Sequence, residues 1–72
     1  MTKIKWSMLN TGNAKIIIYD ISGREIQTIV NETLNPGSYE ATFDGTRFAS
    51  GVYFYRLTAE GYGETRKMML IR

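Results

Sequence analysis

Apolar and polar residues alternate along most of this chain of 72 residues. Ile4, Trp6 and Met8 alternate with lysine and serine near the start, and residues 38–43 repeat the pattern with Tyr39 among their apolar members. A period of two is the signature of a β-strand with one apolar face, and no segment keeps the helical period of 3.6 residues over three turns. The alternation therefore predicts an all-β domain.

Turn-forming residues divide the chain into six short strands. The predicted strands are 3–8, 14–19, 25–30, 38–43, 51–57 and 66–72. They are separated by a turn at 10–13, a tight reversal at 20–24, an irregular connection at 31–36, a loop at 44–51 and a hairpin turn at 60–63. Strands at this spacing predict one domain over 1–72, a small antiparallel β-sandwich of the immunoglobulin or fibronectin type with six to seven strands. Because such sandwiches usually have seven strands, we expect either that an edge strand is missing, which would leave an open sheet edge, or that the domain is a reduced variant.

The alternation also assigns the aromatic residues to the core or to the surface. The inward positions predict core roles for Trp6, Tyr39, Tyr53 and Tyr55, and Phe48 is expected to plug the space under the sheet. The outward positions leave three rings exposed, which are Tyr19, Phe54 and Tyr62. A change from spacing two to spacing three at Ile26, Ile29 and Val30 predicts a β-bulge in the third strand.

Composition argues against several classes of function. The chain has no cysteine and no histidine, so it lacks disulfides, the commonest metal ligand and the usual general base at neutral pH. Its net charge of +2 comes from basic residues that are spread along the chain, which does not favour nucleic-acid binding. No run approaches the length of a membrane helix, and the start resembles no signal peptide. If the protein is exported, we expect its export signal upstream in a longer precursor.

The candidate catalytic side chains are better explained as turn residues. The carboxylates of Asp20, Glu25, Glu32 and Asp44 lack the spacing of a calcium site, and a domain this small has little room for a glycosidase cleft. Three serines, Ser22, Ser38 and Ser50, have no histidine to activate them. The segment 61–63 resembles part of a phosphate loop, but no helix follows it. We therefore expect that the chain is not an enzyme and that it binds no metal and no cofactor.

The segment 66–72 is the strongest candidate for a recognition element. It begins with basic residues, is apolar on both faces from Met68 to Ile71, and ends on a basic residue. One apolar face fits burial against the sheet, and the other fits contact with a partner. The expected recognition residues are Lys67, Met68, Met69, Leu70, Ile71 and Arg72.

Taken in order, several segments resemble the type A C-terminal sorting domain of the type IX (Por) secretion system. The resemblance covers essentially the whole chain through the segments 18–26, 34–39, 43–45, 48–57 and 67–72. Two Gly-x-Tyr motifs fall on Gly37 with Tyr39 and on Gly51 with Tyr53. Further motif residues are Gly23, Pro36, Asp44, Gly45 and Tyr55.

This resemblance implies a non-catalytic signal at the C-terminus of a larger cargo protein from a Bacteroidetes-like bacterium. It implies partners in the outer-membrane translocon and its surface sortase. It also implies passage through the periplasm and delivery to the cell surface or the medium.

Family members usually open with an Asn-Pro-rich stretch before the strand that corresponds to Ile4–Met8, and this chain begins just after that point. We therefore expect the open edge to be filled by a swapped strand or a second copy. The alternative function is an accessory module of a surface enzyme, which either binds carbohydrate through exposed aromatic rings or acts as a structural spacer.

Overall fold

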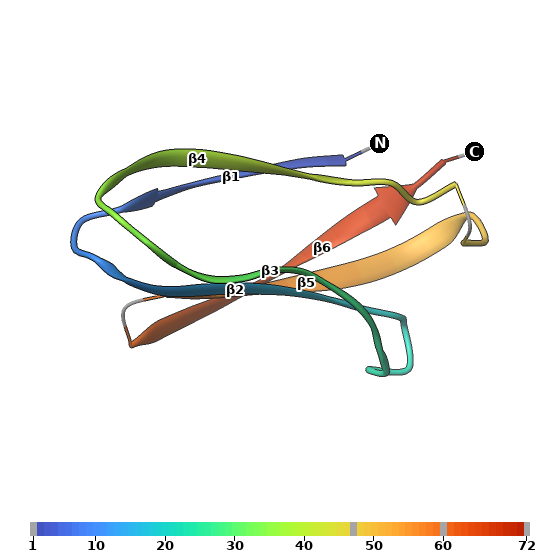
Figure 1. Cartoon of the computed structure of the whole chain (residues 1–72). Helices are drawn as coiled ribbons and strands as arrows, with labels where there is room; N and C mark the ends of the chain where they lie inside the picture. Colours follow the sequence, from blue (N-terminus) through green and yellow to red (C-terminus); the bar gives the residue numbers. More distant parts are fainter. Residues whose placement is uncertain (1, 47, 60, 72) are drawn as a thin grey trace.

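Six antiparallel strands form two sheets that face each other (Figure 1). The computed structural model describes residues 2–46, 48–59 and 61–71, with the side chain of Tyr62 excluded. The strands are β1 (Thr2–Met8), β2 (Gly12–Tyr19), β3 (Glu25–Leu34), β4 (Gly37–Phe43), β5 (Gly51–Ala59) and β6 (Tyr62–Leu70). One sheet has the order β1-β4 and the other β3-β2-β5-β6. The predicted all-β sandwich is confirmed.

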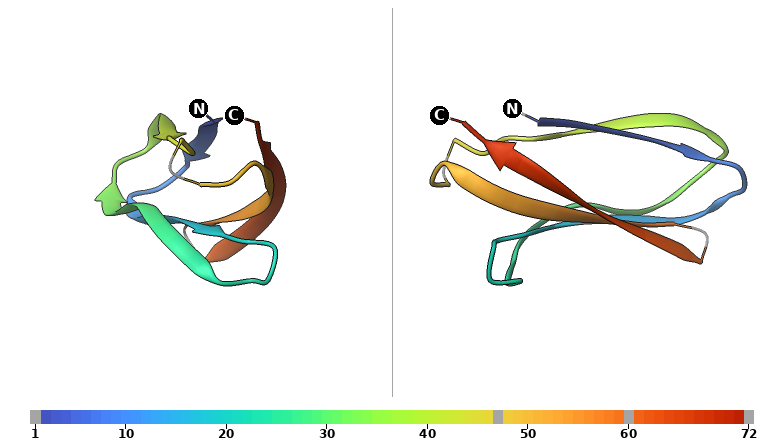
Figure 2. Two further views of the ribbon diagram at one scale, coloured as in Figure 1. Left: turned by 90° about the vertical axis from the view of Figure 1, so that its right-hand side faces the viewer. Right: turned by 180° about the vertical axis from the view of Figure 1, so that it is seen from behind.

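The hydrophobic core lies between the two sheets (Figure 2). Alternate residues of β1 and β2 point into it, and Phe43, Ile16 and Ile18 are its largest fully buried side chains. The buried set consists of Ile4, Trp6, Met8, Ala14, Ile16, Ile18, Phe43, Leu57, Ala59, Met68 and Leu70. Because an alternating strand buries one face only, the opposite face of each sheet is left to solvent.

The third strand is longer than its sequence suggests. Residues 31–34 continue β3 and pair with Lys15–Gly12 of β2, so the expected irregular connection at 31–36 is wrong. These residues include three exposed polar side chains, which gave no apolar alternation to detect. Register shifts at Ile16/Ile17 and at Ile18/Tyr19 confirm an irregular β2–β3 ladder in the region where the bulge was expected.

Three aromatic residues that were expected in the core are only partly buried. Tyr39, Tyr53 and Tyr55 lie on inward positions and pack against the core, but each keeps solvent contact. For Tyr53 and Tyr55 on β5 the reason is the mismatch of the sheets, because two strands cannot cover the whole inner face of four. Trp6 is buried as expected, and its ring stacks on that of Tyr39 with centroids 5.7 Å apart.

Phe48 fills the space at the end of the sandwich, as expected. Its ring lies 5.7 Å from that of Phe43 and 6.3 Å from that of Tyr53. Aromatic pairs at such separations contribute about 0.5–1.5 kcal/mol beyond the area they bury. The loop between β4 and β5 is thereby held against the core.

The tyrosines of the two Gly-x-Tyr motifs each form the same type of hydrogen bond. The hydroxyl of Tyr39 donates to the carbonyl oxygen of Asn35, and the hydroxyl of Tyr53 donates to that of Ala49 over 2.8 Å. Each tyrosine thus reaches four residues back and ties its strand to the preceding turn, as the tyrosine corner of immunoglobulin-like sandwiches does. These motif tyrosines fix the entry of the chain into β4 and β5.

The start of β1 and the end of β6 lie at the same end of the molecule (Figures 1 and 2). The turn between β2 and β3 and the start of β5 also lie at this end, and the whole domain measures 36 × 20 × 16 Å. We refer to it as the terminal end. The turn between β1 and β2, which contains Leu9 and Asn10, lies at the opposite end.

Candidate recognition surface

The apolar residues 68–71, which end β6 and continue one residue beyond it, are divided between the core and the surface. Met68 and Leu70 are 8% and 6% exposed, whereas Met69 and Ile71 are 63% and 87% exposed. Lys67 is exposed on the same side as Met69. The expectation of a strand that is apolar on both faces is confirmed, and Arg72 lies outside the described residues.

The outward side chains of β2, β5 and β6 form one continuous surface, which we call the outer face. Strand pairing places Tyr19 directly opposite Phe54, Phe54 opposite Lys67, and Val52 opposite Met69. Directly opposed residues on one face of a sheet have their Cβ atoms about 4.5–5.5 Å apart. The rings of Tyr19 and Phe54 are therefore neighbours and not scattered, and both are half-buried. The third ring that was expected to be exposed, Tyr62, has no described side chain.

Three cations stand on this outer face without a carboxylate partner. Lys15, Arg56 and Lys67 occupy outward positions of β2, β5 and β6, and none forms an ion pair within the described part of the chain. The guanidinium of Arg56 lies over Gly63, where a Cβ atom would stand only 3.0 Å from Nη2. No carboxylate occupies an outward position in the described residues of these three strands. The outer face therefore combines apolar side chains with positive charge.

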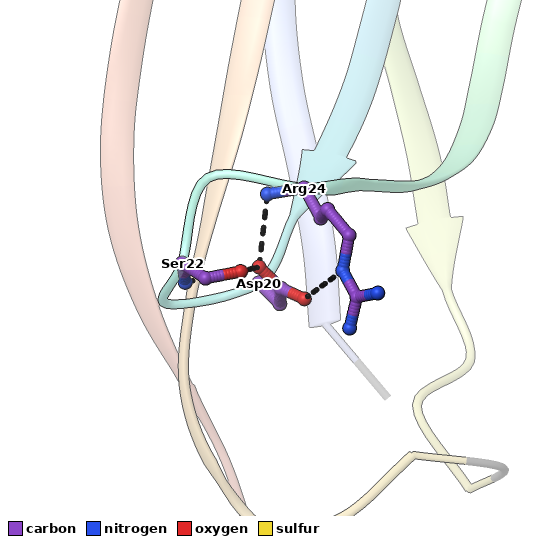
Figure 3. A network of polar contacts seen from close by, with 3 residues as sticks. All are labelled: Asp20, Ser22 and Arg24. Atoms are coloured by element: carbon purple, nitrogen blue, oxygen red, sulfur yellow. Dashed lines mark hydrogen bonds and ion pairs between the residues drawn. The ribbon is translucent and has the colours of Figure 1, made fainter.

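The turn between β2 and β3 is built around the carboxylate of Asp20 (Figure 3). Its Oδ1 accepts hydrogen bonds from the Ser22 hydroxyl at 2.6 Å, the Arg24 backbone N–H at 2.9 Å and the Ser22 backbone N–H at 3.0 Å. The Ser22 hydroxyl, then these backbone donors and the nearby Arg24 charge, lower the pKa of Asp20. Gly23 has φ of 88°, a conformation that glycine adopts readily. The network holds the turn that carries Ile21, which is 74% exposed.

A recess adjoins the outer face at the terminal end. It has a volume of about 260 Å³ and is lined by Asp20, Ile21, Ser50, Gly51, Val52 and Tyr53. Val52 belongs to both the recess and the outer face, since it stands opposite Met69. The apolar surface thus continues from β6 across β5 to the turn that Asp20 organises.

The buried side of β6 is fixed by close packing at Gly45. A Cβ atom on Gly45 would lie 2.8 Å from both terminal methyl carbons of Leu70. The nearby Asp44 carboxylate accepts a hydrogen bond from the Thr46 backbone N–H at 3.1 Å, which shapes this loop. Asp44 and Gly45, which were singled out as motif residues, therefore serve to seat Leu70.

The structure brings some of the motif residues together and leaves others apart. Gly51, Tyr53, Asp44, Gly45 and Gly23 all lie at the terminal end near β6 or the recess. Pro36 lies in the turn between β3 and β4, and Gly37 begins β4, close to the hydrogen bond of the Tyr39 hydroxyl. Sequence reasoning placed Arg56 on the outward side of its strand, but it did not assign Val52, Ile21 or Arg56 to this site. Strand alternation could have placed Val52 and Arg56 on the outer face. The residues beside them on adjacent strands depend on the strand order, which the sequence does not give.

The described residues were also compared with the requirements of a metal site and of a membrane-spanning helix. They contain no cluster of three potential metal-ligating side chains among His, Cys, Asp and Glu. No described segment is a helix that could cross a membrane. A hollow of about 420 Å³ over β1 and β4 is open and shallow, with Lys5 and Glu40 as its charged lining residues. Exposed apolar and cationic side chains, not reactive groups, distinguish this surface.

The family model for the secretion system C-terminal sorting domain matches residues 1–72. The chain belongs to this family. Searches of curated proteins and of solved structures gave no significant match. Membership identifies the domain as a type IX secretion C-terminal sorting signal, in a family that is not catalytic. It also implies an upstream fused cargo and export to the cell surface or the extracellular space.

Proposed function

We propose that this sorting domain directs a folded cargo protein across the outer membrane through the type IX translocon, which reads the outer face at the terminal end. The exposure of Met69 and Ile71 beside buried Met68 and Leu70 carries the proposal. Monomeric soluble proteins rarely expose large contiguous apolar patches, and patches of this kind mark interaction sites. The cargo passes through the periplasm before it reaches the translocon and the surface sortase.

The proposal assigns different roles to alternate residues of the terminal strand. Lys67, Met69 and Ile71 are available to contact the partner, whereas Met68 and Leu70 hold the strand in the sandwich. The predicted recognition segment is thus narrowed to its outward residues, joined by Val52 and Phe54 of β5. The unpaired cations of the outer face favour a partner surface that carries negative charge.

An export assay with matched variants tests the proposal. Residues 2–72 are fused to a periplasmic reporter in a bacterium with a type IX system, and surface delivery is measured. The double variant Met69→Ser, Ile71→Ser should lose most export while its thermal midpoint stays near that of the wild type, because both side chains are exposed. The control is Leu9→Ser at the opposite end, which removes an 83% exposed leucine and should leave export unchanged. Equal loss in both variants would refute recognition at the outer face.

The juxtaposition of Tyr19 and Phe54 supports a second candidate, a carbohydrate-binding role, because adjacent rings on a sheet face can stack on a sugar. Binding to a glycan array that is lost in the Phe54→Ser variant, together with intact export of that variant, would favour it. The homodimer expected through an open sheet edge stays a prediction, which light scattering of the 72-residue chain would check.

A further inference from the structure

The free edge of β1 borders a groove that the sorting role does not use. Strand β1 pairs only with β4, so its other edge has no strand partner within the described chain. Between this edge and the β5–β6 hairpin lies a groove of about 160 Å³. Its lining includes the consecutive residues 4–7 of β1 together with Tyr55, Leu57, Glu64 and Arg66.

The far wall of the groove is polar although it belongs to the inner face of the large sheet. Glu64 stands opposite Leu57 and Arg66 opposite Tyr55, on the same side as the buried residues Met68 and Leu70. Both charged residues are exposed, and they pair with each other over 2.6 Å. The two-stranded sheet does not extend over this part of β6, so the space above it is open to a further element.

Trp6 supplies a second and independent observation. Its side chain is 9% exposed and lines the groove, and its indole Nε1 is buried without a hydrogen-bond partner in the described part of the structure. A buried N–H group that has no acceptor costs about 1–3 kcal/mol. An acceptor supplied by an occupant of the groove would remove this cost.

The charges beside the edge indicate which strand would fit. Lys3 and Lys5 point outward from β1, and both lie 3.9 Å from the single carboxylate of Glu40. Side chains on an added strand would stand directly opposite these lysines. Acidic residues at alternate positions would complement the uncompensated positive charge.

A second copy of β1 is a poor occupant by the same criterion. Antiparallel pairing of two β1 edges over their full length would place Lys5 opposite Lys5 of the other copy. Like charges in direct opposition destabilise a sheet, and edge lysines are a common device against self-pairing. A homodimer would therefore have to use another edge.

We propose that the groove beside β1 binds an extended acidic peptide segment of another polypeptide, which adds a strand to β1 and offers an acceptor to the Trp6 indole. The peptide backbone supplies the ladder hydrogen bonds, its outward acidic side chains meet Lys3 and Lys5, and its inward side chains cover Tyr55 and Leu57. This proposal does not depend on the outer face being the translocon site.

The single tryptophan makes the test direct. The indole N–H signal of Trp6 is followed by NMR in the 72-residue chain while the blocked peptide Val-Ser-Thr-Glu-Val-Glu-Thr is added up to millimolar concentration. We expect the signal to shift to lower field and its hydrogen exchange to slow. The peptide with lysine in place of glutamate should bind about tenfold more weakly, since two favourable opposed pairs become unfavourable.

Matched variants then locate the site. Lys3→Glu with Lys5→Glu should reverse the preference between the two peptides, whereas Lys15→Glu on the outer face should leave it unchanged. Equal binding of both peptides, or perturbation of Val52 and Met69 in place of Trp6, would overturn the proposal. So would the absence of binding at millimolar peptide, or protection of the indole that rises with the concentration of the chain alone, which would indicate a second copy as occupant.

Discussion

Replacement of Gly45 by alanine gives a quantitative test of how the terminal strand is seated. The new Cβ atom would stand 2.8 Å from both terminal methyl carbons of Leu70, whereas carbon atoms in ordinary contact are about 3.5–4.0 Å apart. The strand or the leucine must therefore move by roughly 1 Å. Overpacking of this kind costs about 1–3 kcal/mol, and the entropy that alanine removes from the unfolded chain returns about 0.4–1 kcal/mol.

The net expectation is a loss of about 0–2.6 kcal/mol in the free energy of unfolding, centred on about 1.3 kcal/mol. In a domain of this size, each kcal/mol lowers the thermal midpoint by about 4–8 °C. Urea denaturation followed by tryptophan fluorescence measures the free energy, and differential scanning calorimetry measures the midpoint. Leu70→Val, which shortens the opposing side chain, provides the matched partner for a double-mutant cycle.

The cycle decides whether the contact with Leu70 is the cause. Leu70→Val alone should destabilise the domain modestly, and the double variant should be more stable than the sum of the two single effects predicts. Strict additivity would show that the cost of alanine arises elsewhere. A higher free energy of unfolding for Gly45→Ala would refute the packing argument as a whole, because the entropic gain alone would then describe the result.

Three further outcomes are expected from single substitutions. Tyr53→Phe removes the hydroxyl that donates to the Ala49 carbonyl and should lower the free energy of unfolding by about 0.5–1.5 kcal/mol in urea titrations; no loss would show that the bond is not needed. Phe43→Ala empties a fully buried site and should cost about 3–5 kcal/mol, a large share of the stability of such a small domain, as calorimetry would show. The pKa of Asp20 is lowered in the folded state, chiefly by the Ser22 hydroxyl, so its contribution is present above the ordinary pKa and is lost as pH falls through the depressed pKa. Asp20→Asn should therefore flatten the acid side of the stability profile, and an unaltered profile would count against the network.

The alternation of residues was enough to predict the fold class and much of the core. Trp6 and Ile16 are buried because their period places them inward, and this argument needs no knowledge of strand order. The polar end of β3 was missed because Asn31 and its neighbours carry no apolar stripe, and the backbone of β2 pairs with them regardless of their side chains. The half-exposure of Tyr53 was also missed, because it follows from a two-stranded sheet that covers a four-stranded one.

The candidate site was predicted in part for a similar reason. The outward residues were visible from the sequence because Met69, near the end of β6, and Ile71, just beyond it, alternate with buried Met68 and Leu70. The pairing of Tyr19 with Phe54 joins residues that are far apart along the chain, and it depends on β2 lying beside β5. Such long-range register is set by the packing of the whole sandwich.

The start of β1 and the end of β6 lie together at the terminal end, and this has a consequence for any protein joined ahead of Thr2. The joined chain would emerge near the end of β6, so a cargo attached without a spacer would lie close to the strand that carries exposed Met69. An extended chain spans about 3.3–3.6 Å per residue, so roughly ten residues would let the cargo swing along the 36 Å length of the domain. The length of this linker then determines how far the cargo can move away from β6, and so how accessible β6 is to a partner protein. Shortening the linker residue by residue should lower export while the sandwich itself stays folded.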